Sequence, residues 1–240
     1  MIDLHSHLLF DVDDGALEES ITHRMLENYV RQEVSVIAAT SHSSVDLPQY
    51  QSAFERVSAI AETMGVRLVP GREYSLAAAE EQSAHLQTLG SSRFLLVDLG
   101  RFSVNAALSN RLRDFSRPLL FAHPERLWGA KSVENARFFS ERHEAFFQLN
   151  SGSFLGEYGK TVRKAAWALL NAGFCTVIAS DAHDVCGITL AECRKLLESY
   201  YDAATVSAFF EDNPQRILSG QLPRRILPHC SWISRIRQKF

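Results

Sequence analysis

Residues 1–15 read MIDLHSHLLFDVDDG, and this stretch sets the problem that the whole sequence poses. Two histidines, His5 and His7, flank one serine at the end of a short apolar run, and the acidic segment 11–15 follows. Imidazoles and carboxylates are costly to bury and contribute little to packing. On an extended segment side chains alternate between two faces, so the rings of His5 and His7 would point to the same side. Two such rings can reach a single metal ion.

Further apolar, β-branched runs recur along the chain, with helical patterns between them. The seven runs span residues 2–5, 34–40, 66–71, 93–99, 118–123, 145–150 and 174–180. Between them apolar residues recur every three or four positions, as at 17–32 and 190–200. Strand and helix alternating in this way indicate parallel βαβ units. The predicted fold class is therefore α/β, most naturally a barrel formed by a single domain.

Polar residues fall where these predicted strands end. In a parallel barrel the carboxyl ends of all strands lie on one face, and active sites are built there. Groups that are far apart in the sequence would therefore converge. The polar strand ends are His5 and His7, His42, Glu73, Asp98, His123, Asn150, and Asp181 with His183.

Imidazoles and carboxylates together suit borderline divalent ions such as zinc, manganese or iron. Three dications and four carboxylates would leave a charge of about +2, which a phosphomonoester dianion would neutralise. A metal-bound water of lowered pKa would supply a hydroxide nucleophile near neutral pH. Arg126, three residues after His123, would add a forked clamp on the phosphoryl oxygens. Nine candidate ligands suit three ions that share bridging carboxylates: His5, His7, Asp14, His42, Glu73, Asp98, His123, Asp181 and His183.

Each of these elements also has a purely structural explanation when it is taken alone. Residues 13–15 can form a turn and a helix N-cap, which is the interpretation we favour for Asp13. The segment at Asp181 can cap a following helix. Glu73 can be a solvated loop residue, His42 a satisfied core histidine, and Arg126 can pair with Glu125 or a helix end. Position argues against all of these explanations together, because packing does not place polar residues at the ends of most strands.

Composition limits the remaining possibilities. The chain has 240 residues, 46% of them hydrophobic, and four scattered cysteines without a zinc-finger or disulfide spacing. We see neither a membrane span nor a secretory signal, and expect a cytoplasmic protein. Residues 221–240 carry five basic residues and no acid, which leaves 20 basic against 28 acidic residues, or −8, in residues 1–220. So acidic a body is a poor partner for nucleic acid.

Six segments, in this order, closely resemble the bacterial PHP-type (polymerase and histidinol phosphatase superfamily) protein-tyrosine phosphatases of capsule and exopolysaccharide clusters. They are HSHLLFDVDDG, ATSHS, PGREY, AHPER, QLNSGSFLGEYG and ASDAH. The resemblance runs from Met1 to about Gln221, which we take as the phosphatase domain (1–221), followed by a basic C-terminal tail (222–240). It implies a distorted (β/α)7 barrel of the TIM type with a trinuclear centre, most often supported by manganese. It also implies hydrolysis of phosphotyrosine on a membrane-bound tyrosine autokinase.

The same resemblance implies a role for each candidate. Arg126 would bind phosphate. One ion would be held by His5, His7, Glu73 and Asp181, a second by Glu73, Asp98 and His123, and a third by Asp14, His42 and His183.

Two departures from the family pattern accompany the match. Asp98 stands where the family usually has a glutamate, and DVCGITL at 184–190 lacks the family's loop arginine. These two departures are the best support for one alternative, a metal-binding pseudoenzyme that binds a kinase or a membrane. Two others keep the chemistry and change the substrate: a PHP-type histidinol-phosphate phosphatase, and a nuclease, which the acidic body disfavours. Trp232, Ile233 and Ile236 alternate with arginines in the tail, which is typical of a basic amphipathic helix on an anionic membrane. A tail that packs on the barrel is the competing interpretation.

Overall fold

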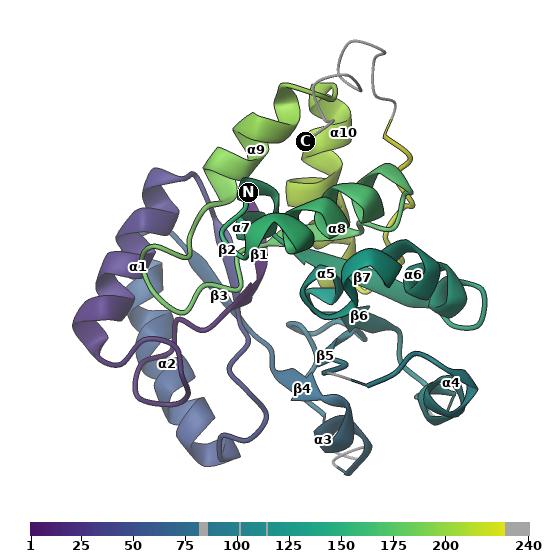
Figure 1. Ribbon diagram of the computed structural model, residues 1–240. Coiled ribbons are helices and arrows are strands. Elements are labelled where there is room, and N and C mark those ends of the chain that lie inside the picture. The colour runs from purple at the N-terminus through teal and green to yellow at the C-terminus, as the bar shows by residue number, and fades with distance from the viewer. Residues whose placement is uncertain (82–85, 101, 114, 229–240) are drawn as a thin grey trace.

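Eight parallel strands in two sheets form the centre of the molecule in the computed structural model, which describes residues 1–81, 86–100, 102–113 and 115–228. The first sheet has the order β1-β2-β3 and the second β4-β5-β6-β7-β8 (Figure 1). The strands are β1 (Ile2–Ser6), β2 (Val36–Ala39), β3 (Arg67–Pro70), β4 (Glu73–Ser75), β5 (Leu95–Asp98), β6 (Leu119–Phe121), β7 (Ala145–Asn150) and β8 (Val177–Ala179).

The two sheets are joined by isolated parallel bridges at both of their junctions. One bridge pairs Ser6 with Ala182, and the other pairs His42 with Glu73. At the first junction the backbone N–H of Asp181 donates to the His5 carbonyl (2.8 Å), and that of His7 donates to the Ala182 carbonyl (2.9 Å). The α/β class with parallel strands is confirmed. The third predicted strand, however, is followed by a short additional strand, because the chain crosses from one sheet to the other between Pro70 and Glu73.

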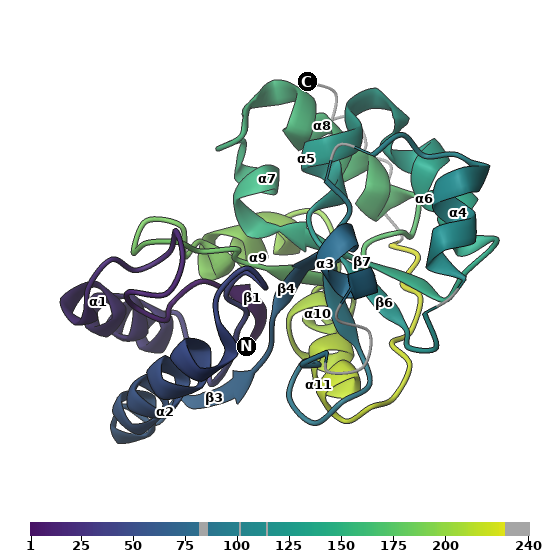
Figure 2. The ribbon, with the colours of Figure 1, turned by 90° about the horizontal axis from the view of Figure 1, so that it is seen from below.

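Helices cover the outside of the strands. In Figures 1 and 2 α1 and α2 lie beside the first sheet, while α5, α6 and α8 pack together beside β7. The helices are α1 (Glu19–Arg31), α2 (Leu47–Thr63), α3 (Leu76–Glu81), α4 (Ala106–Leu112), α5 (Pro124–Trp128), η1 (Gly129–Lys131), α6 (Ser132–Ser140), α7 (Ser151–Leu155), α8 (Gly159–Asn171), α9 (Leu190–Glu198), α10 (Ala203–Ser207), η2 (Ala208–Asp212) and α11 (Asn213–Leu218).

The alternation of side chains along the strands divides the core into two layers. In β2, Val36 and Ala38 belong to one buried cluster, whereas Ile37 and Ala39 belong to the other. The smaller cluster collects buried residues from β1, β2, β3, β5, β6 and β8, so it fills the space that both sheets surround. The larger cluster lies between the strands and the helices. Apolar strands buried on both faces are expected for parallel βα units, and most of the polar side chains predicted for the site lie near the ends of these strands.

Residues 219–228 follow α11 and run back along the body. The backbone of Arg224 exchanges two hydrogen bonds with the buried Asn213 side chain, and the Arg225 guanidinium stacks over Phe174 (5.2 Å). The tail residues that we expected to bind a membrane, Trp232, Ile233 and Ile236, lie outside the described residues. His85 and His229, to which we assign no role, also lie outside them. Across the described ranges, no helix combines the length and the apolar character needed to cross a membrane.

Candidate metal centre

All nine predicted ligands meet in one cluster beside the carboxyl ends of β1, β5, β6 and β8. His5 lies in β1 and His7 just after it, and Asp98 is the last residue of β5. Glu73 follows the third strand, β3, as expected, and is also the first residue of the additional strand β4. Within each of four overlapping groups the ligand atoms lie within 4.8 Å of one another: His7, Asp14, His42 and His183; His5, His7 and Glu73; His5, His123 and Asp181; and Glu73, Asp98 and His123.

Glu73 lies at the centre of this constellation, with only 2% of its side chain exposed. Its Oε2 lies 3.0 Å from His42 Nδ1, and its Oε1 lies 3.1 Å from His123 Nε2. His5 Nε2 and His7 Nε2 each lie 3.5 Å from Oε2. Burial alone would raise the pKa of Glu73, but the surrounding imidazoles outweigh it and hold the pKa well below its ordinary value. A buried carboxylate that faces four imidazoles is suited to bridging metal ions.

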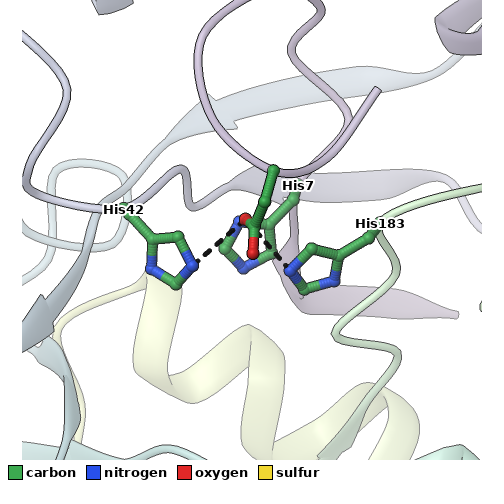
Figure 3. A group of neighbouring side chains, drawn as sticks. His7, His42 and His183 are labelled. Carbon is green, nitrogen blue, oxygen red and sulfur yellow. Dashed lines mark ion pairs between the residues drawn. The ribbon is translucent and has the colours of Figure 1, made fainter. Parts of the chain in front are cut away.

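A second carboxylate, that of Asp14, reaches the centre from the loop before α1. Its Oδ1 lies 3.2 Å from His42 Nε2 and 3.4 Å from His183 Nε2. Figure 3 shows the rings of His42 and His183 on either side of His7, with both ion pairs converging between them. The rings of His7 and His183 are stacked 4.0 Å apart. Since 65% of the Asp14 side chain is exposed, this corner of the centre is open to solvent.

Asp181 connects the ligands to Arg126. His5 Nε2 lies 3.3 Å from Asp181 Oδ1, while the Arg126 guanidinium donates to Oδ2 at 2.6 Å. The Asn150 amide donates to the same Oδ2 at 2.7 Å. Burial raises the pKa of Asp181, but His5 and His123 lower it by more, so the carboxyl is ionised. The alternative in which Arg126 pairs only with Glu125 or a helix end is wrong.

Two residues that orient the ligands were not identified as such from the sequence. Asp13 accepts a turn hydrogen bond from the Gly15 N–H (3.1 Å), as expected, but the N-cap of α1 is Glu18. The other oxygen of Asp13 lies 2.8 Å from His7 Nδ1. Gln148, buried in β7, lies 3.0 Å from His5 Nδ1. Its place inside the apolar run AFFQLN was the available signal, because a buried amide needs a hydrogen-bond partner.

Two of the candidate ligands sit on backbone that favours glycine. His123 has φ of 33° and Asp181 has φ of 54°. Residues other than glycine are held in this left-handed region only where the surrounding structure imposes it, and such positions cluster at functional sites. The conformation turns both side chains into the centre immediately after β6 and β8.

The donor set fits divalent cations. His123 Nδ1 is buried without a hydrogen-bond partner among the described residues. Burial lowers the pKa of His7 and His123, but the neighbouring acids outweigh this effect and raise the two values to about 10 and about 9. The acids thus hold protons on imidazoles that would otherwise lose them near neutral pH. Metal ions meet the same demand for positive charge, and displace those protons when they bind.

Asp98 retains a place in the centre despite its shorter side chain. One of its oxygens takes part in the group with Glu73 and His123. Its Oδ1 also accepts a hydrogen bond from the Gly100 N–H at 2.8 Å, which fixes the carboxyl in the turn after β5.

Comparison with known proteins agrees with this geometry. A curated relative, the tyrosine-protein phosphatase CpsB of Streptococcus pneumoniae, is 30% identical over 243 residues, covering 92% of this chain and all of that protein. The tyrosine-protein phosphatase YwqE of Bacillus subtilis is 28% identical over 200 residues, covering 77% of this chain and 78% of that protein.

Solved structures show the same fold. One comes from a study of YwqE from Bacillus subtilis and CpsB from Streptococcus pneumoniae, described as metal-dependent tyrosine phosphatases; it superposes with a TM-score of 0.83 at 24% identity, covering 96% of this chain and 99% of that one. An amidohydrolase of Mycoplasma synoviae shares the fold more distantly, at a TM-score of 0.58 and 11% identity, covering all of this chain and 93% of that one. The model of the family described as capsular polysaccharide synthesis, CpsB/CapC, matches residues 1–219. The chain therefore belongs to the CpsB/CapC family of capsular polysaccharide synthesis proteins.

Proposed function

We propose that this protein is a metal-dependent protein-tyrosine phosphatase that hydrolyses the phosphomonoester of phosphotyrosine on a partner protein. The observation that carries the proposal is the convergence of four carboxylates and five imidazoles at one end of the strands, with an arginine beside them. Curated relatives of matching length are tyrosine-protein phosphatases. An intact ligand set also argues against a pseudoenzyme.

The nine ligands are proposed to hold three divalent ions. Manganese is the ion we expect, with iron or zinc as alternatives, because mixed nitrogen and oxygen donors suit all three. Ions held there would polarise the phosphoryl group and acidify the attacking water. We propose one ion held by His5, His7, Glu73 and Asp181, a second by Glu73, Asp98 and His123, and a third by Asp14, His42 and His183. The group of Glu73, Asp98 and His123 supports the second ion directly, and a group of His7, Asp14, His42 and His183 supports the third. For the first ion, His5 is grouped with His7 and Glu73, and separately with His123 and Asp181.

The chain's own residues would bind and orient the substrate around that centre. Arg126 presents a planar guanidinium at the edge of the ligand cluster and can bind two phosphoryl oxygens at once. Asp13 and Gln148 fix the rings of His7 and His5, so that the nitrogens facing the centre keep their direction. Since segment 184–190 contains no arginine, Arg126 is the residue to which we assign phosphate binding.

The partner that we propose is a membrane-bound tyrosine autokinase of capsule or exopolysaccharide synthesis. The match to a capsular polysaccharide synthesis family supports this choice. The protein would act in the cytoplasm as one phosphatase domain (1–221), with the basic tail (222–240) as a possible contact to an anionic membrane surface. Loss of liposome co-sedimentation after deletion of 223–240 would support the tail's role, and unchanged binding would end it.

Turnover measured on a small substrate panel tests the proposal. The protein is assayed with added manganese on a phosphotyrosine peptide and on histidinol phosphate, and its bound metal is measured by elemental analysis. We expect hydrolysis of the peptide, preference for it over histidinol phosphate, and a strong loss of kcat/KM in Arg126→Ala. Preference for histidinol phosphate would favour the small-molecule phosphatase, and metal-loaded protein without turnover would favour the pseudoenzyme.

A further inference from the structure

Arg126 is held by two contacts of different kinds. Its Nη1 donates to Asp181 Oδ2 at 2.6 Å, and its guanidinium carbon lies 4.7 Å above the centre of the Tyr158 ring. Asp181 is also a proposed metal ligand, so the first contact depends on a carboxylate with a second task. The contact with the Tyr158 ring makes no such demand, and it restrains the guanidinium from a second side.

Tyr158 reaches this position from the connection between α7 and α8, after β7. Gly156 and Gly159, with φ of 96° and 86°, allow the sharp turns on either side of it. Burial and the charge of Asp181 raise the pKa of the Tyr158 hydroxyl, and together they outweigh Arg126 and a hydrogen bond with the Asn150 side chain, which lower it. The phenol is therefore neutral.

The ring is partly open to the outside. Although it packs against Arg126, 38% of Tyr158 is exposed, which places it among the few large exposed hydrophobic residues of the described chain. Because the guanidinium carbon of Arg126 lies 4.7 Å from the centre of this ring, the ester substituent of a phosphoryl group bound by Arg126 would be within reach of it. An aryl substituent can pack against an aromatic ring, whereas a small polar alkyl substituent gains little from it.

We propose that Tyr158 determines substrate specificity: its ring orients Arg126 toward the phosphoryl group and packs against the phenyl ring of the substrate, so that aryl phosphates are preferred over alkyl phosphates. This inference rests on the proposed phosphatase function. The orientation of Arg126 is more important here because segment 184–190 contains no arginine, so this loop supplies no second guanidinium to bind the phosphoryl group.

The two roles of the ring have separable consequences. Loss of the stacking contact disturbs Arg126 and lowers kcat/KM for every phosphomonoester. Loss of ring packing is felt only by aryl substrates, and an aromatic pair contributes about 0.5–1.5 kcal/mol, which corresponds to roughly 2- to 12-fold in kcat/KM. This second effect appears mainly in KM, because the phenyl ring is already packed in the bound substrate.

The experiment compares kcat/KM for para-nitrophenyl phosphate and for β-glycerophosphate in the manganese-loaded wild type, Tyr158→Ala, Tyr158→Leu and Tyr158→Phe. The ratio between the two substrates, taken relative to the wild type, removes their different intrinsic reactivities. We expect the ratio to fall roughly 2- to 12-fold in the Ala and Leu variants, and to stay at the wild-type value in the Phe variant. Tyr158→Leu keeps apolar bulk, so it replaces the Ala variant if that variant does not fold.

A matched control comes from a second exposed aromatic residue that lies on a loop and contacts an arginine. Phe102 is 44% exposed and lies under Arg111 (4.9 Å), and Phe102→Ala should leave the ratio unchanged. An unchanged ratio in both Tyr158→Ala and Tyr158→Leu would overturn the inference, as would a Phe variant that behaves like the Leu variant. If the wild type hydrolyses neither substrate, the proposed function fails, and the inference fails with it. If the wild type hydrolyses both, only the inference is at stake.

Discussion

Asp13→Asn offers the sharpest test of how the metal centre is held. Asp13 is not a proposed ligand, but one of its oxygens lies 2.8 Å from His7 Nδ1 and accepts from the His42 backbone N–H at 3.0 Å. The other oxygen accepts from the Gly15 N–H at 3.1 Å. The pKa of Asp13 is lowered to about 2, since hydrogen bonds and the charge of His7 outweigh the effect of burial. The side chain is therefore ionised, and both oxygens act as acceptors.

An amide cannot reproduce this arrangement, because it has one acceptor and one donor. If its oxygen faces His7 and His42, its NH2 group faces the Gly15 N–H; if it is reversed, the NH2 group faces two donors. At least one donor is left facing another in either orientation, which costs about 1–3 kcal/mol. Removing a group that orients a metal-bound histidine lowers metal affinity about 10- to 100-fold, or about 1.4 to 2.7 kcal/mol. Both values lead us to expect weaker metal binding by one to two orders of magnitude.

Calorimetric titration of metal-stripped protein with Mn²⁺ measures this loss directly, and the manganese dependence of phosphatase activity provides a second reading. Asp11→Asn is the matched control, because Asp11 lies in the same loop with an exposed side chain. Its φ of 58° is equally accessible to asparagine. Equal manganese affinities in the two folded variants would refute the orienting role of Asp13.

Three further predictions concern the same centre. Because the pKa values of His7 and His123 are raised to about 10 and about 9, both rings are protonated near neutral pH in the metal-free protein. Metal binding should therefore release protons, and metal affinity should increase as the pH rises. Calorimetry in buffers of different ionisation enthalpy measures the proton release. Gly15→Ala should abolish tight metal binding, since its Cβ would lie 2.0 Å from the His7 carbonyl oxygen; Gly65→Ala, with φ of 75° and open space around it, should cost only roughly 1–2 kcal/mol of stability in a thermal melt. Asp98→Glu should retain or raise the bound metal per chain, because the longer side chain keeps the carboxyl and extends its reach; elemental analysis showing a lost ion would contradict this.

The sequence was sufficient for the convergence of the site but not for its supporting contacts. The ends of parallel strands share one face whatever their exact bounds, so the meeting of His5, His42 and His123 followed from order and period alone. The contact between His5 and Gln148 joins residues 143 positions apart, and no local pattern encodes such a pairing. Similarly, the division between β3 and β4 depends on how the two sheets meet.

The prediction for Asp13 was right about the turn, wrong about the helix N-cap, which is Glu18, and incomplete for a related reason. An acidic residue two positions before a glycine is typical of a turn, and that hydrogen bond exists. The turn alone, however, does not reveal that the second carboxylate oxygen faces His7. Tertiary contacts thus added a second role to a residue whose role in the turn was predicted correctly.

The hydrogen bonds between β1 and the segment after β8 have a consequence for biosynthesis. The backbone of His5 and His7 pairs with that of Asp181 and Ala182, so proposed ligands that are synthesised early wait for ligands that lie far later in the sequence. A chain made only as far as residue 180 carries seven of the nine proposed ligands but lacks Asp181 and His183, so the centre is incomplete. We therefore expect the newly synthesised enzyme to be inactive until β8 and the segment after it have left the ribosome and paired with β1.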